Sequence, residues 1–239
     1  MRIGIPRERK PFEGRVALVP PACAELIQHG HQVAVESGAG RLSGYADTDY
    51  LNAGAQIAAD GAALYGFAQL IVKVKEPIEE ELSWLRRDQL LFSYLHLAAA
   101  EPLLKRLAEI GLTAVAFETV QELDGSLPLL APMSDIAGRL AVQVGTHLLH
   151  LPQGGKGLLL GGLPGARRGR VTIIGAGTAG GNAAVLAAAA GAEVTVFDRR
   201  RDRLEQMRSL GPNVTALYPY GHTVAEAVAG ADLVIGAVL

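Results

Sequence analysis

Short apolar runs alternate with helical patterns through the first half of the chain. Runs of isoleucine, valine and leucine predict strands at residues 2–5, 32–36, 70–75, 90–94 and 112–117. Between them, residues 20–30 and 101–111 have helical patterns that end at glycines. This alternation is typical of βαβ units and predicts a mostly parallel sheet with helices on both faces. The segment 36–50 is rich in glycine and aspartate, which predicts a loop.

A second alternation of strands and helices starts at Arg170, after a glycine-rich segment that we interpret as a loop or linker. Before that segment, residues 134–151 carry apolar side chains at helical spacing, namely Ile136, Leu140, Val144 and Leu148. A helix of this length can join two domains. We therefore predict an α/β protein with domains at 1–133 and 134–239, linked by the helix 134–151.

Composition and charge limit the classes of partner. The 239 residues carry 22 basic and 24 acidic side chains, with 49% hydrophobic residues and no basic block, so nucleic acid and anionic membranes are not expected partners. The first ten residues lack the pattern of a signal peptide, and the apolar run 183–192 is about half as long as a membrane span. Cys23 is the only cysteine, which excludes an intramolecular disulfide and a CxxC metal site. We expect a cytoplasmic, metal-free protein that binds a small molecule.

Residues 170–200 contain a GxGxxG motif between two predicted strands. Gly175 permits the tight turn, Gly177 lets a pyrophosphate approach the backbone, and Gly180 lets the helix pack close to the strand. The helix that follows presents free amides and a partial positive charge to the phosphates. Asp198 lies about twenty residues further on, where an acid binds the ribose hydroxyls of adenosine. We therefore predict a Rossmann-type, doubly wound parallel sheet that binds a dinucleotide.

Asp198 also decides which dinucleotide is preferred. A carboxylate at this position repels a 2′-phosphate, so we predict NAD as the cofactor rather than NADP. Arg199, Arg200 and Arg201 follow directly and keep NADP open as an alternative. A solvated start of a helix is the simpler interpretation of these arginines.

A nicotinamide cofactor implies hydride transfer, so the domain 1–133 must bind the substrate and move protons. Arg15 follows a PFEG loop, and its guanidinium could hold a carboxylate through paired hydrogen bonds. Lys73 and Lys75 alternate with valines and so share one strand face, with Lys75 nearer the carboxyl end, where open α/β sheets bind ligands. His96 follows another predicted strand and suits proton transfer near neutral pH. Each of these side chains also has an ordinary structural interpretation, and for Lys73 we expect a solvent-facing or sheet-end position.

Several segments together resemble the alanine dehydrogenases. They are IGIPRERKPFEGRVALVP, VESGAG, VKVKEP, YLHLAAA, FETVQELDGSLPLLAPMSDIAGRLA, GGLPG and VTIIGAGTAG, and they are spread through essentially the whole chain. The resemblance implies reversible, NAD-dependent oxidative deamination of L-alanine to pyruvate and ammonium, in a homohexamer. The family chain continues beyond ADLVIGAVL, so this chain is expected to be its N-terminal two-thirds, with both domains incomplete at the C-terminus.

The resemblance also implies roles for single residues. Arg15 and Lys75 would bind the substrate carboxylate, Lys75 could also polarise the forming carbonyl, and His96 would transfer protons. Contacts with NAD are implied for Ser134, Gly175, Gly177, Thr178, Ala179, Gly180, Asp198, Arg203 and Leu239. Pro219 and Tyr220 depart from the family, in which serine or asparagine is common near the adenosine.

Two other functions agree with many of these features. The NAD(H)-binding subunit of the proton-translocating transhydrogenases resembles this chain in its two-domain build and IGIPRER opening, but that family lacks the lysine and histidine found here as Lys75 and His96. A catalytically inactive NAD-binding fragment is the second alternative, because the catalytic aspartate of the alanine dehydrogenases would lie beyond this chain. The predicted strand 233–239 would then leave a sheet edge uncovered, from which we expect poor solubility or association.

Overall fold

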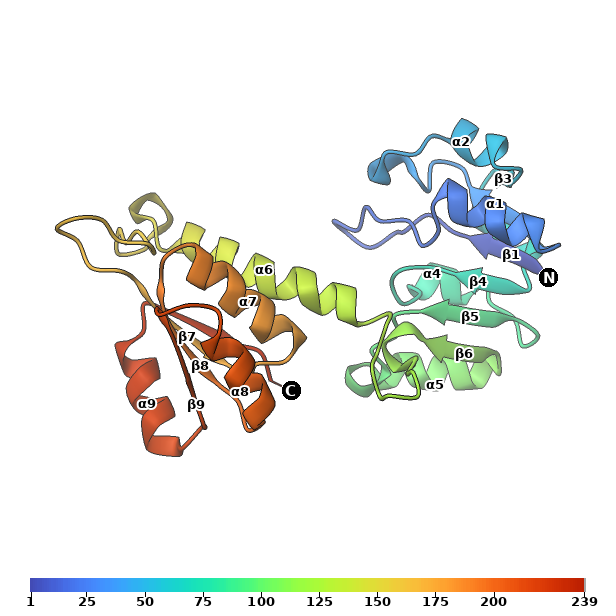
Figure 1. The fold of residues 1–239 in the computed structure, drawn as a ribbon. Coiled ribbons are helices and arrows are strands. Elements are labelled where there is room, and N and C mark those ends of the chain that lie inside the picture. The colour runs from blue at the N-terminus through green and yellow to red at the C-terminus, as the bar shows by residue number, and fades with distance from the viewer. Residues whose placement is uncertain (239) are drawn as a thin grey trace. The chain divides into compact units, whose positions relative to one another are not determined.

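The computed structural model describes residues 1–238 and divides into two compact units, Met1–Leu129 and Leu130–Leu239 (Figure 1). Each unit contains one parallel sheet with helices packed on both faces. This arrangement confirms the predicted α/β class with doubly wound parallel sheets.

The first unit is built on a six-stranded sheet in the order β3-β2-β1-β4-β5-β6, in which every neighbouring pair is parallel. Its strands are β1 (Arg2–Ile5), β2 (Gln32–Glu36), β3 (Gln56–Ala58), β4 (Leu70–Val72), β5 (Leu90–Ser93) and β6 (Thr113–Ala116). The strand order reverses between β1 and β4. Open sheets of this kind bind ligands beyond the carboxyl ends of the strands at such a switch point.

Helices cover both faces of this sheet because successive strand residues point to opposite sides. In β2, Val33 and Val35 pack in one cluster with Cys23 of α1, whereas Ala34 packs in a second cluster with Leu64 of α3. The helices are α1 (Pro20–Gln28), α2 (Asp47–Asn52), α3 (Gly61–Phe67), α4 (Glu79–Leu82) and α5 (Glu101–Ile110), with short 3₁₀ turns η1 (Arg41–Ser43), η2 (Leu97–Ala99) and η3 (Phe117–Thr119). The first cluster takes in α1 and α2, and the second takes in α3, α4 and α5.

Some local predictions for this unit were wrong. The strand predicted at 70–75 ends at Val72. The segment 36–50, predicted as a loop, contains η1 and the start of α2, where a carboxylate oxygen of Asp49 accepts the N–H of Ala46 at 2.7 Å and caps the helix. The elements β3 and α3 were not predicted, since β3 has only three residues and too few for a periodic pattern.

The second unit is built on a four-stranded parallel sheet in the order β10-β7-β8-β9. Its elements are α6 (Ala131–Leu148), η4 (Leu151–Gln153), β7 (Arg170–Ile174), α7 (Thr178–Ala189), β8 (Glu193–Phe197), α8 (Arg201–Arg208), β9 (Val214–Leu217), α9 (Gly221–Gly230) and β10 (Leu233–Gly236). Val171 and Ile173 of β7 pack in one cluster with the buried alanines of α7. Thr172 points to the other face, where its hydroxyl donates to the carbonyl oxygen of Ala227 in α9 at 3.1 Å. The helices therefore cover both faces here as well.

The long helix α6 differs from its prediction in position. It begins three residues earlier than expected because Pro132 is compatible with a first helical turn, and it ends before Pro152. The apolar side chains at helical spacing are about half exposed, as Ile136 (51%) and Val144 (53%) show. The buried positions are Gly138, Val142 and Gly145. Gly138 allows α6 to approach α7 closely, and Gly145 allows it to approach Leu233 of β10.

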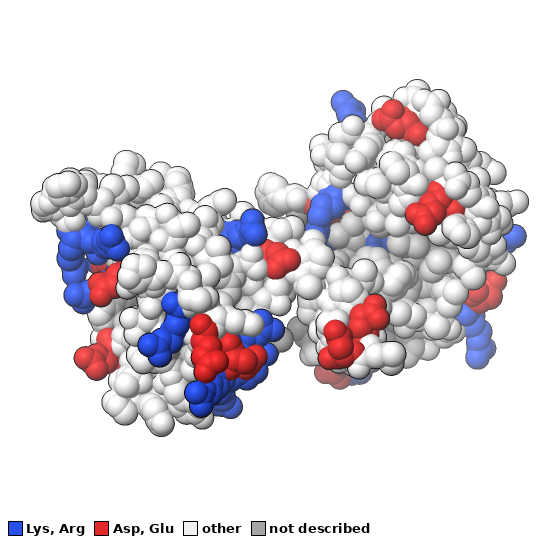
Figure 2. All heavy atoms as spheres, viewed as in Figure 1, with Lys and Arg blue, Asp and Glu red and all other residues white. Residues whose placement is uncertain are grey.

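No helix within residues 1–238 is both long and apolar enough to cross a bilayer. On the face shown in Figure 2, basic and acidic side chains lie close together rather than in separate areas of one sign. Opposite charges also pair one turn apart along helices, as between Lys105 and Glu101 at 2.8 Å in α5 and between Arg201 and Glu205 at 2.9 Å in α8. Exposed pairs of this kind contribute little stability each.

Candidate active site

The carboxyl ends of β1 and β4 lie side by side in the first unit. Their register pairs Ile3 with Leu70 and Gly4 with Ile71, although the strands are far apart in the sequence. The segments that leave these two strands therefore meet at the switch point of the sheet. Lys75 belongs to the segment after β4, which is the position that the strand-end rule predicts for a ligand-binding residue.

Lys73 is completely buried, so a solvent-facing position is wrong, but it does lie at the sheet end, directly after β4. Its ammonium lies 3.2 Å from a carboxylate oxygen of Glu81 and 3.4 Å from one of Glu8. Regular strand geometry ends at Val72, so the alternation of faces does not extend to this lysine. The other oxygen of Glu81 accepts the hydroxyl of Tyr65 at 3.0 Å. Lys73 is therefore the counter-ion of two buried acids.

Glu8 connects this buried cluster to the main chain at Lys75. One of its oxygens accepts the N–H of Val74 at 2.6 Å, and the other accepts the N–H of Lys75 at 3.3 Å. Burial raises the pKa of Glu8, although the charge of Lys73 and the two amides act in the opposite sense. These bonds fix the backbone of Lys75, whose side chain is half-buried.

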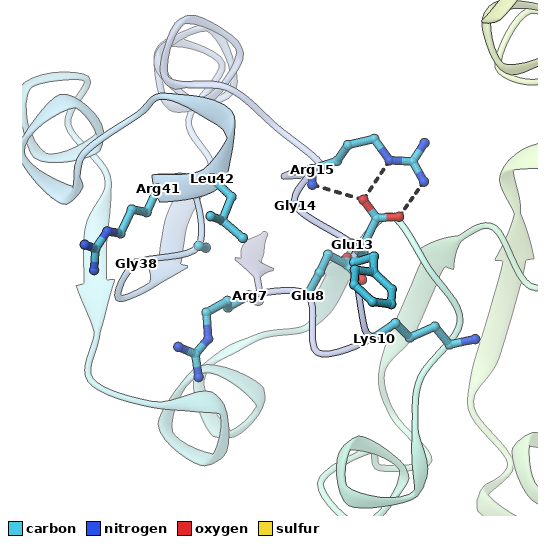
Figure 3. Close-up of a pocket in the computed structure, with 11 residues that line it drawn as sticks. Arg7, Glu8, Lys10, Glu13, Gly14, Arg15, Gly38, Arg41 and Leu42 are labelled. Carbon is cyan, nitrogen blue, oxygen red and sulfur yellow. Dashed lines mark hydrogen bonds and ion pairs between the residues drawn. The ribbon is translucent and has the colours of Figure 1, made fainter. Parts of the chain in front are cut away.

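Arg15 and Glu13 form a two-pronged ion pair (Figure 3). Nε of Arg15 donates to Oε1 of Glu13 at 2.8 Å, and Nη2 donates to Oε2 at 2.6 Å. The hydrogen bond with Arg15 lowers the pKa of Glu13, and the nearby charge of Lys75 acts in the same direction. The Glu13 carboxylate thus occupies a position where the charges of Arg15 and Lys75 both stabilise an anion.

Tyr94 relates His96 to Arg15, because its ring stacks on that of His96 and its pKa responds to the charge of Arg15. The rings of Tyr94 and His96 are stacked, with centroids 6.2 Å apart and planes 13° from parallel. Burial raises the pKa of Tyr94, and the charge of Arg15 opposes that shift. The hydroxyl of Tyr94 donates to the carbonyl oxygen of Leu129. Arg15, Lys75 and His96 therefore come together around Glu13 and Tyr94.

A cavity of about 520 Å³ lies beside this group (Figure 3). Its charged lining consists of Arg7, Glu8, Lys10, Glu13, Arg15 and Arg41. Among the described residues, Lys75 and His96 do not line it. The cavity therefore borders the site on the side of Arg15, where the segment after β1 meets the loop after β2.

Four residues of this group were missed by reasoning from the sequence: Glu8, Glu13, Tyr94 and Glu118. The three glutamates share one role, because each accepts the main-chain N–H of a predicted site residue. The pairs are Glu8 with Lys75, Glu13 with Arg15 and Glu118 with His96. A glutamate that binds main-chain amides leaves no periodic pattern in the sequence. The only signal available was that most of these residues follow the ends of strands.

The glycine motif of the second unit forms a tight turn between β7 and α7. Gly175 has φ +101°, which is in the left-handed region that favours glycine. A Cβ atom on Gly180 would lie 1.8 Å from the carbonyl oxygen of Gly175, so only glycine permits this approach. Around Gly177, by contrast, a Cβ would meet no atom within 4 Å. The turn therefore leaves open space for a ligand beside the start of α7.

Asp198 lies at the end of β8, close to this turn. Its oxygens accept the N–H of Ala176 at 2.7 Å and the N–H of Arg200 at 2.8 Å. Burial acts to raise the pKa of Asp198, but these amides and the Arg200 guanidinium together lower it. A cavity of about 450 Å³ is lined by Asp198 together with Gly175, Phe197 and Pro219. An ionised carboxylate beside a cavity of this size fits the ribose of an adenosine.

Ser134 and the turn of α7 lie in neighbouring parts of the second unit. Thr178 and Ala179 are the first two residues of α7, and Ser134 lies in the first turn of α6. A Cβ on Gly138 would lie 2.0 Å from the carbonyl oxygen of Ala179, so the two helices touch one turn beyond Ser134. These residues could therefore contact one ligand.

Arg203 carries an unsatisfied donor that an anionic ligand could use. Its Nη1 donates to Gln206 at 3.2 Å, while its Nε is buried without a hydrogen-bond partner among the described residues. Pro219, which departs from the resembled family, lines the cavity beside Asp198. Leu239, for which a cofactor contact was predicted, lies outside the described residues. The glycine turn and the acid at Asp198 together fit a dinucleotide.

Comparison with known proteins identifies both halves of the chain. The chain matches the Alanine dehydrogenase/PNT N-terminal domain at residues 4–137 and the Alanine dehydrogenase/PNT C-terminal domain at residues 141–239. Alanine dehydrogenases of Geobacillus stearothermophilus and Bacillus subtilis are each 49% identical to it across the whole chain. The chain spans 64% and 63% of their lengths, which is less than two-thirds.

Solved structures give the same result. An L-alanine dehydrogenase matches with a TM-score of 0.92 and 48% identity, where the chain is covered completely and spans 66% of that protein. A transhydrogenase from Sinorhizobium meliloti matches with a TM-score of 0.82 and 28% identity, over 99% of this chain and 69% of its own. Since both halves of the sequence match, in order and over nearly their full extent, this chain belongs to the alanine dehydrogenase/PNT family.

Proposed function

We propose that this protein catalyses the reversible, NAD-dependent oxidative deamination of L-alanine to pyruvate and ammonium. The observation that carries the proposal is the grouping of Arg15, Lys75 and His96 around Glu13 and Tyr94. Two cations that stabilise one carboxylate, beside a histidine, are suited to an amino acid that must be held and deprotonated. The relatives named above as alanine dehydrogenases add support.

The substrate carboxylate would take the place that Glu13 occupies on Arg15. A guanidinium can hold a carboxylate through two parallel hydrogen bonds, as it holds Glu13 here. Lys75 would contribute a second positive charge and donate to the oxygen that develops on the α-carbon. Bound NAD would supply the two-electron oxidation of that carbon. The residues of the chain orient the substrate so that its α-carbon can react.

His96 would handle the protons of the hydrolytic step. After oxidation the substrate is an iminium, and water must add to its α-carbon. His96 would accept the proton of that water and then donate a proton to the departing amine. Its exposed ring, stacked on Tyr94, is accessible to such a water.

The test is NADH formation by the purified protein with L-alanine and NAD. We expect turnover with L-alanine and much slower turnover with D-alanine, because Arg15 and Lys75 fix the carboxylate and thereby the direction of the Cα–H bond. In the reverse direction, pyruvate and ammonium should consume NADH. If neither direction proceeds while the protein still binds NADH, the proposal is wrong for this protein.

That result would favour the second candidate, an NAD(H)-binding subunit of a transhydrogenase. It is supported by the similarity to the Sinorhizobium meliloti transhydrogenase. The substrate group around Arg15 has no evident use in such a subunit. An inactive NAD-binding fragment would give the same negative result. Unlike a transhydrogenase subunit, it would have no partner protein to which it passes electrons.

We expect Asp198 to set the preference for NAD. Replacing it with serine should raise KM for NAD by about tenfold or more, since a hydrogen bond to a charged group contributes about 1.5–3 kcal/mol. KM for NADP should fall, because the repulsion of its 2′-phosphate is removed. Initial rates with both cofactors measure the change. Asp202→Ser, at an exposed acid in the next helix, is the control and should change neither constant.

Other features of the proposal rest on the family resemblance. We propose a homohexamer in the cytoplasm, with a substrate domain at 1–133 and a NAD-binding domain at 134–239. Sedimentation of the purified protein would test the hexamer.

A further inference from the structure

The main chain at His96 has an unusual conformation for a residue with a side chain. His96 has φ +49° and ψ +37°, in the left-handed region that is disfavoured for L-residues other than glycine. Within the described residues, Phe12 is the only other non-glycine residue with a positive φ. Something in the surrounding structure must therefore hold His96 in this conformation.

Glu118 makes the contacts that can do so. Its Oε1 accepts the N–H of His96 at 2.7 Å, and its two oxygens lie 3.2 and 3.3 Å from the N–H of Leu95. The sheet brings these residues together, because Ser93 of β5 is in register with Ala116 of β6. Leu95 and Glu118 each lie two residues beyond that pair. The carboxylate of Glu118 forms no salt bridge within residues 1–238. Its hydrogen bonds instead go to the turn that carries His96.

The direction of the imidazole depends on this turn. Because the left-handed conformation fixes the Cα–Cβ bond of His96, it also fixes the plane in which the ring can stack on Tyr94. Tyr94 is itself held by its hydrogen bond to Leu129. If the backbone at His96 relaxed to an ordinary conformation, the ring would point elsewhere.

We propose that Glu118 is a positioning residue that holds the imidazole of His96 in its reactive orientation. This inference rests on the proposed function, since it assumes that His96 transfers protons. Glu118 touches no reacting atom in this scheme. It acts by accepting two main-chain hydrogen bonds, and an uncharged acceptor of the same shape should serve nearly as well.

The test compares Glu118→Ala, Glu118→Gln and the control Glu122→Ala in the oxidation of L-alanine. Glu122 is an exposed acid in the segment after η3, so its removal should change nothing. We expect Glu118→Ala to lower kcat by about a hundredfold, as misplacing a catalytic group by about 1 Å can do. KM for L-alanine should stay within about threefold, because Arg15 and Lys75 are untouched. Glu118→Gln should keep kcat within about threefold of the unchanged protein, because its amide oxygen still accepts.

The outcomes separate this proposal from the proposed function. If the unchanged protein does not oxidise L-alanine, the proposed function fails. If it does, but Glu118→Ala keeps full kcat, the positioning role is wrong. A loss of kcat in Glu118→Gln equal to that in Glu118→Ala would also overturn it, because the charge rather than the acceptor would then matter. If Glu118→Ala does not fold, Glu118→Met, which fills the same space without an acceptor oxygen, replaces it in the comparison.

Discussion

Replacing Lys73 with methionine is expected to lower the free energy of unfolding by about 3–5 kcal/mol, the usual cost of removing one partner of a buried ion pair. The ammonium of Lys73 is fully buried between Glu8 and Glu81. Methionine fills a similar volume, so the loss comes from the buried acids rather than from a cavity. Glu8 loses its counter-ion, and among the described residues Glu81 keeps only Arg9, 3.9 Å away. Urea unfolding followed by circular dichroism measures the change.

Lys105→Met is the matched control for this experiment. Lys105 is exposed and pairs with Glu101 one turn away on α5. Its removal should cost about 0.5 kcal/mol or less, as for other surface pairs of this kind. Equal losses for the two variants would contradict a structural role for the buried lysine.

The stability difference between Lys73→Met and the unchanged protein should depend on pH. Burial already raises the pKa of Glu8 in the native protein, and removing Lys73 takes away a charge that opposes this shift. An acid whose pKa is higher in the folded state than in the unfolded state makes the protein less stable as pH rises through the folded pKa. The free energy of unfolding of the variant should therefore lie furthest below that of the unchanged protein at pH 8. At pH 5 the two values should be closer. A constant difference across this range would mean that Glu8 does not take up a proton when Lys73 is absent.

Replacing Lys75 with methionine should have the largest effect on catalysis. We expect kcat/KM for L-alanine to fall by about a thousandfold or more, since losing one donor to a developing oxyanion alone costs about 10²–10³. Loss of a charge on the substrate carboxylate adds to this. Initial rates of NADH formation measure the effect, and the Kd for NADH, measured by fluorescence, should stay unchanged.

Lys10→Met is the control for Lys75. Lys10 lines the cavity beside Arg15, but its ammonium is paired with Glu76. We expect its removal to change kcat/KM by less than about tenfold, because its ammonium is already held by Glu76 and it lies outside the group around Glu13. Turnover by Lys75→Met at the rate of Lys10→Met would remove Lys75 from the mechanism.

The positions of the proposed ligand-binding residues could be predicted because they follow the ends of strands. Lys75 follows β4 and His96 follows β5, and the order of strands puts these ends beside the switch point. The glycine turn and Asp198 were predictable for a similar reason, because their roles depend on the local sequence from β7 to β8. These features all arise within one βαβ unit or from one strand.

Contacts between distant segments could not be predicted from a single sequence. Alternation put Lys73 on a strand face, but its environment is decided by Glu8 and Glu81, which come from other segments. The helical spacing of apolar residues in α6 does not reveal its buried face, because Gly138 and Gly145 make close contacts there with Ala179 and Leu233. Glycines are counted as neutral in an apolar pattern, although they permit the closest helix contacts.

The hydrogen bonds of Glu8 have a consequence for how the site forms during folding. They join residues 65 to 67 positions apart, so they can form only after the N-terminal segment has docked beside β4. Closing a loop of that length costs chain entropy before the contact returns any stability. We therefore expect Lys75 to reach its final place late, after the local helices and the neighbouring strands have formed. The amide of Val74 should become protected from hydrogen exchange only in the last cooperative step of refolding. Its protection therefore reports that the site is complete.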